Sequence, residues 1–387
     1  MKWELYSKNI IKPLLAARAP HLNARHYDAA ASVFPFRNNP YVINKLIDWS
    51  NVPEDPIFRL TFPQPDMLKP EQLESMLSAI LTTEMCDHVK ERCKRNFIVD
   101  RAKLIRNGLN PHPAGQKEEN VPKLEGRDVL GCQHKYQETV LFFPAEVGLS
   151  PVRLSLARLS FTDVGSKQQF KGKVPQLLME YIAQHRQVKD VLFTGGDPME
   201  AMRLIRKTGA NIRTQSPLVR GINDSAPVWT EMWNQQVKLG AIPYYMFIER
   251  DTGAHDYFSV PLARAYEIFN DAKSAASGCG RTVRGPSMSA GPGKIEIEGI
   301  SDIPSEDGKG LQKVFNLKFL QARNPAWTKA PFYAKFDPKA TWLSDLNPAF
   351  GGDKFFFEQE YEDQIKSDSS KSSGQMDFSE PPSCGST

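Results

Sequence analysis

KDVLFTGGDP, residues Lys189–Pro198, is an apolar run that ends in two glycines, an aspartate and a proline. A continuous apolar run bounded by turn residues is typical of a buried strand in a parallel sheet. The two glycines lack Cβ atoms, so a ligand could approach the main chain closely. Asp197 adds a hydrogen-bond acceptor, and Pro198 can open the next helix. The residues alone fit either a ligand-binding turn or an ordinary strand-to-helix turn.

Strand and helix patterns alternate on both sides of this run. Further strands are predicted over Glu138–Ala145, Asn211–Arg220 and Ile242–Ile248. Helices with one apolar face are predicted over Val174–Gln187, Ala226–Lys238 and Pro261–Ser274. Strands that alternate with helices of this length indicate an α/β fold, with a parallel sheet or a segment of a barrel.

The two ends of the chain have other patterns. Lys69–Lys94 has helical apolar spacing, whereas Lys294–Ile300 and Lys313–Phe319 alternate polar and apolar residues, as paired antiparallel strands do. A tail rich in Ser, Lys, Gly and Pro follows. We therefore divide the chain into a helical N-terminal region (1–130), an α/β core (131–280), a C-terminal subdomain (281–352) and a disordered tail (353–387).

Composition excludes several classes of function. The net charge of +4 is small for 387 residues and no dense basic block is present, so nucleic-acid binding is not indicated. No apolar run approaches the roughly 20 residues that cross a bilayer, so no membrane span is expected. Five cysteines with no metal-site or disulfide spacing indicate a reducing compartment, the cytoplasm. A mitochondrial leader is the alternative, although Pro13 and Pro20 interrupt the basic N-terminal segment.

Five short motifs occur in an order that one protein family shares. They are Gly131–Tyr136 (GCQHKY), Leu192–Pro198 (LFTGGDP), Gln215–Asp224 (QSPLVRGIND), Pro243–Tyr245 (PYY) and Gly291–Lys294 (GPGK). In this order they resemble the lysine 2,3-aminomutase family of radical S-adenosylmethionine (SAM) enzymes. These enzymes move the amino group of an amino-acid substrate from carbon 2 to carbon 3.

The resemblance implies a fold and a set of cofactors. The fold would be a partial (β/α) barrel of the radical SAM type, with its site at the carboxyl ends of the strands. A [4Fe-4S] cluster would cleave SAM, and pyridoxal 5′-phosphate (PLP) would be held by a lysine. By resemblance the PLP lysine is Lys294, and the cofactor-binding residues are Gly195, Gly196, Asp197, Pro198, Gln215 and Ser216. The family also leads us to expect a homo-oligomer.

The residues around Lys294 are compatible with this role. Flanking glycines let the side chain reach inward, and removal from water would lower the pKa of its amine towards a nucleophilic form. Without the resemblance, a solvated lysine at the start of a strand is the alternative.

The first departure from the family lies where the cluster should bind. The family places C-x3-C-x2-C just after the first strand, so that three thiolates hold three irons. The corresponding positions here are Gly148, Val152 and Ser155. Glycine and valine offer no side-chain ligand, and serine is a poor substitute for thiolate. The chain as written is therefore expected to lack the cluster and to be inactive. No residue of the chain is expected to bind a metal.

The second departure follows Pro198, where only Met199–Lys207 stand in place of several strand–helix units. The barrel would be truncated. Gly148–Ser160 also lacks any acid or aromatic residue between well-matched flanks, as an out-of-frame exon would. The alternatives to an active enzyme are therefore a PLP-binding pseudoenzyme or a faulty gene model of an active aminomutase.

The resemblance also bears on the substrate. Lysine-using members have acidic residues where this chain has Arg250 and Ser287. Arg250 would repel an ammonium group and suit a carboxylate. Because the register is uncertain by one residue, Asp251 is the alternative to Arg250. We therefore expect an acidic or other non-lysine amino acid, such as glutamate, as the substrate of an intact relative.

Overall fold

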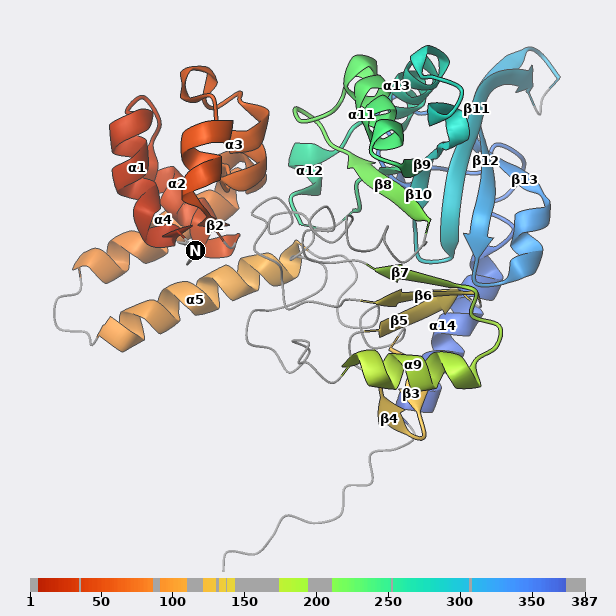
Figure 1. The fold of residues 1–387 in the computed structure, drawn as a ribbon, viewed down its shortest axis with the longest axis horizontal. Coiled ribbons are helices and arrows are strands. Elements are labelled where there is room, and N and C mark those ends of the chain that lie inside the picture. The colour runs from red at the N-terminus through yellow and green to blue at the C-terminus, as the bar shows by residue number, and fades with distance from the viewer. Residues whose placement is uncertain are drawn as a thin grey trace, which may run out of the picture.

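A computed structural model provides the fold. It describes residues 6–34, 36–85, 91–109, 121–129, 132–136, 138–142, 174–193, 211–251, 253–305 and 308–373. These residues form a mixed α/β structure with a lobe of helices at one side (Figure 1). Among the described helices, none combines the length and the apolar character that a bilayer crossing requires.

The described residues of the N-terminal lobe are mainly helical (Figure 1). Its helices are α1 (Ile11–Arg18), α2 (Ala24–Val33), α3 (Pro56–Thr61), α4 (Pro70–Met85) and α5 (Glu91–Gly108), and the two-residue strands β1 (Tyr6–Ser7) and β2 (Arg37–Asn38) pair beside them. Asp55 caps α3 by accepting a hydrogen bond from the Phe58 N–H over 2.6 Å. Pro56 fits the first turn of α3, because that position needs no N–H donor.

The single helix predicted over Lys69–Lys94 is wrong. Helix α4 ends at Met85 and α5 begins at Glu91, and buried residues of both helices, including Met76 and Ile105, belong to one apolar cluster. An apolar spacing that suits a helix does not reveal where the chain folds back on itself, because both arms of a helical hairpin have the same period.

A six-stranded sheet forms the centre of the α/β part. Its strands are β8 (Ile212–Leu218), β9 (Ala241–Ile248), β10 (Arg284–Ser289), β11 (Gly293–Pro304), β12 (Leu311–Ala322) and β13 (Pro331–Lys335), and they lie side by side in this order. β8, β9 and β10 are parallel, whereas β10 to β13 pair antiparallel. The strands predicted at Asn211–Arg220, Ile242–Ile248, Lys294–Ile300 and Lys313–Phe319 are confirmed.

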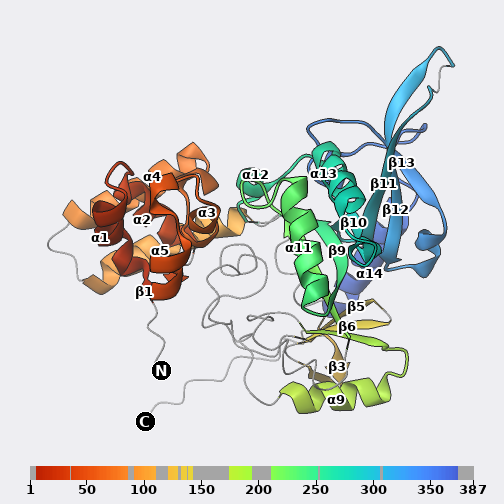
Figure 2. The ribbon, with the colours of Figure 1, turned by 45° about the horizontal axis from the view of Figure 1, so that its top comes forward.

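Two helices cover one face of this sheet. They are α11 (Ala226–Lys238) and α13 (Leu262–Ala275), which stand beside the sheet in Figures 1 and 2. Trp229 and Trp233 of α11 are fully buried in one apolar cluster with Met246, Met288 and Ile295 of the sheet. Burial of large aromatic and aliphatic side chains fixes which face each strand turns towards the helices.

A three-stranded sheet lies below the first one in Figure 1. It consists of β5 (Cys132–Tyr136), β6 (Thr139–Phe142) and β7 (Asp190–Phe193), with helix α9 (Val174–Gln184) packed on it and the short hairpin β3 (Lys123–Leu124) and β4 (Arg127–Asp128) nearby. β6 and β7 are parallel, as the α/β alternation predicted. The Gln321 side chain of β12 donates a 2.8 Å hydrogen bond to the Glu138 carboxylate and joins the two sheets. The described strands do not form a closed barrel.

Two features of the C-terminal part differ from expectation. The boundary at residue 280 falls within one sheet, because β10 to β13 continue the parallel strands β8 and β9. The tail predicted to be disordered from residue 353 contains helix α14 (Glu358–Ser373), so this prediction was wrong for that stretch. Phe355 and Phe357, just before α14, are buried against Phe332 of β13 and anchor the segment.

Candidate functional site

Lys294 is the second residue of β11, directly after a closely packed glycine. A Cβ at Gly293 would lie 2.3 Å from the carbonyl oxygen of Gln321 on β12. Real Cβ atoms do not approach a backbone oxygen so closely, so only glycine allows the two strands to pair here. The close approach fixes the start of β11 and therefore the place from which the Lys294 side chain extends.

The Lys294 amine is buried and has no carboxylate partner within 4 Å in the described part of the chain. The side chain is only 8% exposed, and burial lowers the pKa of the amine to about 8. Its Nζ lies 3.8 Å from the centroid of the Tyr245 ring on β9, so the π-face of that ring is an electrostatic partner of the amine. A lysine in such surroundings is neutral more often near pH 7 than an exposed one, and is therefore a better nucleophile.

The strand register brings other predicted residues to the same face. Gln215 of β8 pairs with Tyr245, and Lys294 pairs with Ser289, two residues from Ser287. Because residues that pair across strands share a face and residues two apart do so as well, Gln215, Tyr245, Ser287 and Lys294 all lie on the face opposite α11 and α13. The sheet thus brings these residues together on the face that turns away from α11 and α13, where Lys294, Ser287 and Tyr245 are all buried.

Ser216 lies on the other face. It pairs with Met246, which is part of the cluster beneath the helices. Thr214, two residues earlier and therefore on the same face, donates a 2.7 Å hydrogen bond to Gln236 of α11. The structure therefore brings Gln215 towards Lys294 and turns Ser216 away. Ser287 is fully buried, and its hydroxyl lies 3.5 Å from the Met246 carbonyl oxygen.

Arg250 and Asp251 follow the last residue of β9, beside two residues that sequence reasoning missed. Glu249 is only 6% exposed, and burial raises the pKa of its carboxyl group to about 7. Its Oε2 lies 3.7 Å from Nδ1 of His255, the first residue of helix α12 (His255–Phe258). The only available sequence signal was a glutamate placed directly at the carboxyl end of a buried strand.

Several predicted residues lie outside the described ranges. These are Gly195, Gly196, Asp197 and Pro198 of the expected SAM turn, and the three positions aligned with the cluster cysteines. Three cysteines are described: Cys93 on α5, Cys132 on β5 and Cys279 before β10. Burial raises the pKa of the Cys132 thiol to about 12, which disfavours the thiolate that iron requires. The described residues include no group of three or more His, Cys, Asp or Glu side chains that could hold a metal.

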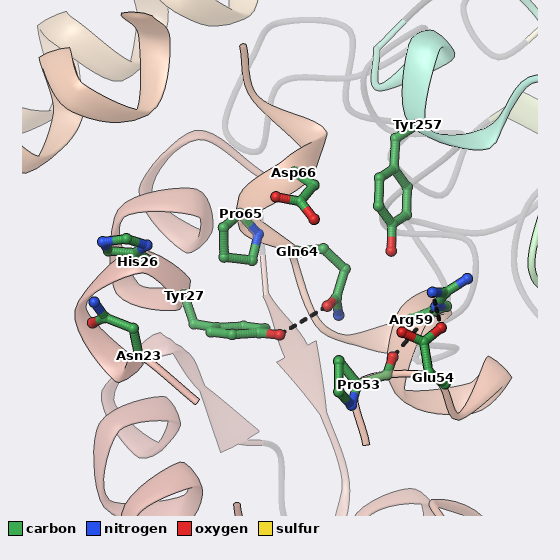
Figure 3. Close-up of a pocket in the computed structure, with 10 residues that line it drawn as sticks. All are labelled: Asn23, His26, Tyr27, Pro53, Glu54, Arg59, Gln64, Pro65, Asp66 and Tyr257. Carbon is green, nitrogen blue, oxygen red and sulfur yellow. Dashed lines mark hydrogen bonds and ion pairs between the residues drawn. The ribbon is translucent and has the colours of Figure 1, made fainter. Parts of the chain in front are cut away.

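A cavity of about 240 Å³ lies elsewhere, between the N-terminal lobe and α12. Figure 3 shows Tyr27, Gln64 and Asp66 of the lobe facing Tyr257 of α12. The Tyr27 hydroxyl donates a 3.0 Å hydrogen bond to Gln64, and burial raises the pKa of Tyr27. None of the predicted site residues lines this cavity, so it is separate from the Lys294 face.

Comparison with known proteins places the chain among relatives of one kind. It is 26% identical, over 381 residues, to a protein of Aquifex aeolicus (strain VF5) named "Putative L-lysine 2,3-aminomutase". The alignment covers 87% of this chain and 94% of the relative. The chain is similar to lysine 2,3-aminomutases over most of its length. A shorter match, 31% identical over 78 residues, joins 20% of the chain to 19% of the L-lysine 2,3-aminomutase of Clostridium subterminale.

No family model matches the chain. The similarity to aminomutases inferred from the five motifs is thus supported by whole-chain comparison. The comparisons therefore support an aminomutase-like function at the level of the family.

Proposed function

We propose that this chain is an aminomutase-like protein that binds PLP through Lys294 but, as written, cannot generate the radical that amino migration requires. The burial of the Lys294 amine, with its lowered pKa, is the observation that supports this most. A protein with no use for a nucleophilic amine would gain by exposing this lysine, because burial of a cation without a counter-charge is costly.

The residues around Lys294 fit PLP. The amine is buried on the sheet face opposite α11 and α13, is held at a strand start that only glycine permits, and has no described carboxylate that would keep it protonated. When bound, PLP supplies an electron sink at the amino-bearing carbon of an amino acid. The chain's own contribution is to hold the neutral amine of Lys294 in a fixed position, packed against the face of the Tyr245 ring.

The barrel and the SAM site remain part of the proposal. The parallel β8–β9–β10 strands with α11 and α13 on one face, and the parallel pair β6–β7, are the units that a partial (β/α) barrel would contain. Residues 195–198 come shortly after β7 in the sequence, and Gln215 lies on the same sheet face as Lys294, which supports the proposal that SAM would bind near Gln215. We propose that the barrel is truncated after Pro198, where few residues precede β8.

The residues present do not fit a [4Fe-4S] cluster. The three aligned positions, Gly148, Val152 and Ser155, offer no thiolate, and the described cysteines lie on separate elements. The chain as written would be a PLP-binding pseudoenzyme.

A faulty gene model is the second candidate, favoured by the abrupt change of composition over Gly148–Ser160. Sequencing the transcript tests it. A faulty gene model predicts that the message encodes a different segment, one with cysteines at these positions. A message that encodes Gly148–Ser160 in frame would leave the pseudoenzyme as the only form of the proposal.

We further propose that Arg250 selects an acidic amino acid over lysine. An arginine suits a carboxylate and repels an ammonium group, and Ser287 offers no charge for an ammonium. We expect glutamate to change the absorbance of the PLP-loaded protein at a concentration about tenfold lower than lysine does, since one charge reversal at a partly buried site amounts to about 1.4 kcal/mol. Arg250→Gln should remove the difference. Equal or stronger action of lysine on the unmodified chain would contradict the assignment.

A further inference from the structure

His255 stands where three parts of the molecule meet. It opens helix α12, which lies beside the N-terminal lobe in Figures 1 and 2. Its ring reaches back to the end of β9 and across to Thr341, 86 residues later in the chain. Phe258 of the same helix is buried in the cluster of the N-terminal lobe. The protonation state of this ring therefore affects how firmly the loop that contains Arg250 is held.

One ring nitrogen must donate a proton to the backbone. Nδ1 of His255 lies 3.2 Å from the carbonyl oxygen of Arg250. A carbonyl oxygen has no proton and can only accept, so a hydrogen bond here requires the proton on Nδ1.

The other ring nitrogen faces a hydroxyl whose proton is already engaged. Nε2 lies 3.1 Å from Oγ1 of Thr341, and the same Oγ1 lies 3.0 Å from Oδ2 of Asp345. That Oδ2 also accepts from the backbone N–H groups of Thr341 and Trp342, so it acts as an acceptor throughout. The Thr341 and Asp345 oxygens are 3.0 Å apart, so a proton must lie between them. The carboxylate has none to give, so the single hydroxyl proton of Thr341 is used in this hydrogen bond. Oγ1 must then accept from Nε2.

A neutral imidazole has one N–H, and this geometry needs two. We infer that His255 is an imidazolium in the folded protein and that it acts as a positioning residue, fixing the Arg250 backbone to the Thr341–Asp345 turn. The inference rests on the proposed function in that Arg250 is there assigned to the substrate carboxylate. His255 itself is not assigned any contact with substrate.

The charges around the ring support a cation. Glu249 Oε2 at the end of β9 lies 3.7 Å from Nδ1, too far for a direct hydrogen bond, and attracts the ring cation in its ionised form, which the raised pKa of about 7 leaves partly populated near pH 7. The other charged groups that act on the pair are Asp251 in the same loop and Arg220 after β8, and Asp345 lies behind Thr341. Acidic groups outnumber basic ones.

The pKa of His255 follows the same balance. Burial alone would lower it, but the Glu249 carboxylate, the Arg250 carbonyl and Asp251 raise it above the ordinary value. A histidine with a raised pKa in the folded state stabilises the fold fully below its unfolded pKa of about 6.5, and this contribution is lost as the pH rises through the folded pKa. The Arg250 loop should therefore be best ordered on the acidic side of that transition.

The test uses the full chain labelled with ¹⁵N at its seven histidines. Long-range ¹H–¹⁵N spectra at pH 7 should show both ring nitrogens of His255 protonated, with His255→Gln giving the assignment. Thr341→Val removes the acceptor of Nε2 at nearly constant volume and should lower the pKa of His255, whereas the matched Thr341→Ser keeps the hydroxyl and should leave it unchanged. A second readout is the concentration of glutamate that half-saturates the absorbance change, which should rise with pH in the unmodified chain and in Thr341→Ser, but not in Thr341→Val.

The outcomes separate this inference from the proposed function. A neutral His255 with one bare nitrogen at pH 7, or a His255 pKa unaffected by Thr341→Val, overturns the inference whatever the protein binds. A doubly protonated His255 in a protein that shows no preference for glutamate upholds the charge state and removes the positioning role together with the assignment of Arg250.

Discussion

Lys294→Ala should abolish the absorbance at about 420 nm that the unmodified chain acquires after incubation with PLP and removal of the free cofactor. The expected loss is complete, because PLP attaches through a covalent bond to one lysine amine. Lys294 is the buried lysine of the described core and the one whose pKa is lowered there, to about 8.

The matched control is Lys313→Ala. Lys313 is exposed on β12, on the strand next to that of Lys294, so its loss changes the protein's charge equally without touching the buried amine. This variant should keep the full absorbance. Attachment of PLP to the unmodified chain should become faster as the pH rises through about 8, because only the neutral amine attacks a carbonyl. An absorbance that survives in Lys294→Ala would place the cofactor, if bound, on another lysine.

The parts of the fold that sequence predicted are those with a strong local pattern. Helix α11 has the predicted bounds, Ala226–Lys238, because a proline near its start and Gly240 after its end mark both termini. Strand β9 differs from Ile242–Ile248 by one residue, since its apolar run is bounded by Gly240 and by charged residues. Local signals of this kind do not depend on the rest of the chain.

The parts that were missed depend on distant contacts. β10, RGPSMS, has a glycine and a proline that are typical of loops, yet it pairs between β9 and β11. Gly285 has a φ of +133°, and a Cβ there would lie 2.3 Å from the Met246 carbonyl oxygen, so the glycine serves a close approach within the sheet. Helix α14 is held by buried phenylalanines just before it, which the polar composition of the tail conceals.

The candidate site divides in the same way. Lys294 was found because a four-residue motif in the right order indicated it, and Gln215 because it lies in a second motif. Glu249 and His255 were missed because no local pattern marks them as a pair, and the contact between His255 and Thr341 spans 86 residues. Ser216 shares a motif with Gln215, but alternation along β8 turns it towards α11.

The second large effect that we expect is that the chain as written fails to bind an iron–sulfur cluster. A [4Fe-4S] cluster open to SAM needs three thiolates close together, and this chain has Gly148, Val152 and Ser155 at the aligned positions. Serine alone cannot replace three sulfur ligands. Without the cluster no electron reaches SAM, so neither radical formation nor amino migration is expected from the chain as written.

The triple variant Gly148→Cys, Val152→Cys, Ser155→Cys is the matched comparison. It adds the three missing ligands and changes nothing else in the sequence. Under identical anaerobic treatment with iron and sulfide we expect it to retain more iron than the unmodified chain, because thiolates are the ligands that iron–sulfur clusters prefer. Equal iron in the two proteins at a high level would mean that other residues hold it.

Iron per chain, measured after anaerobic reconstitution and desalting of the unmodified protein, tests the central claim most directly. We predict only background iron, no brown colour and no EPR signal on reduction with dithionite. About four iron atoms per chain, with a signal typical of a reduced [4Fe-4S] cluster, would contradict the claim that this aminomutase-like protein lacks its radical-generating centre.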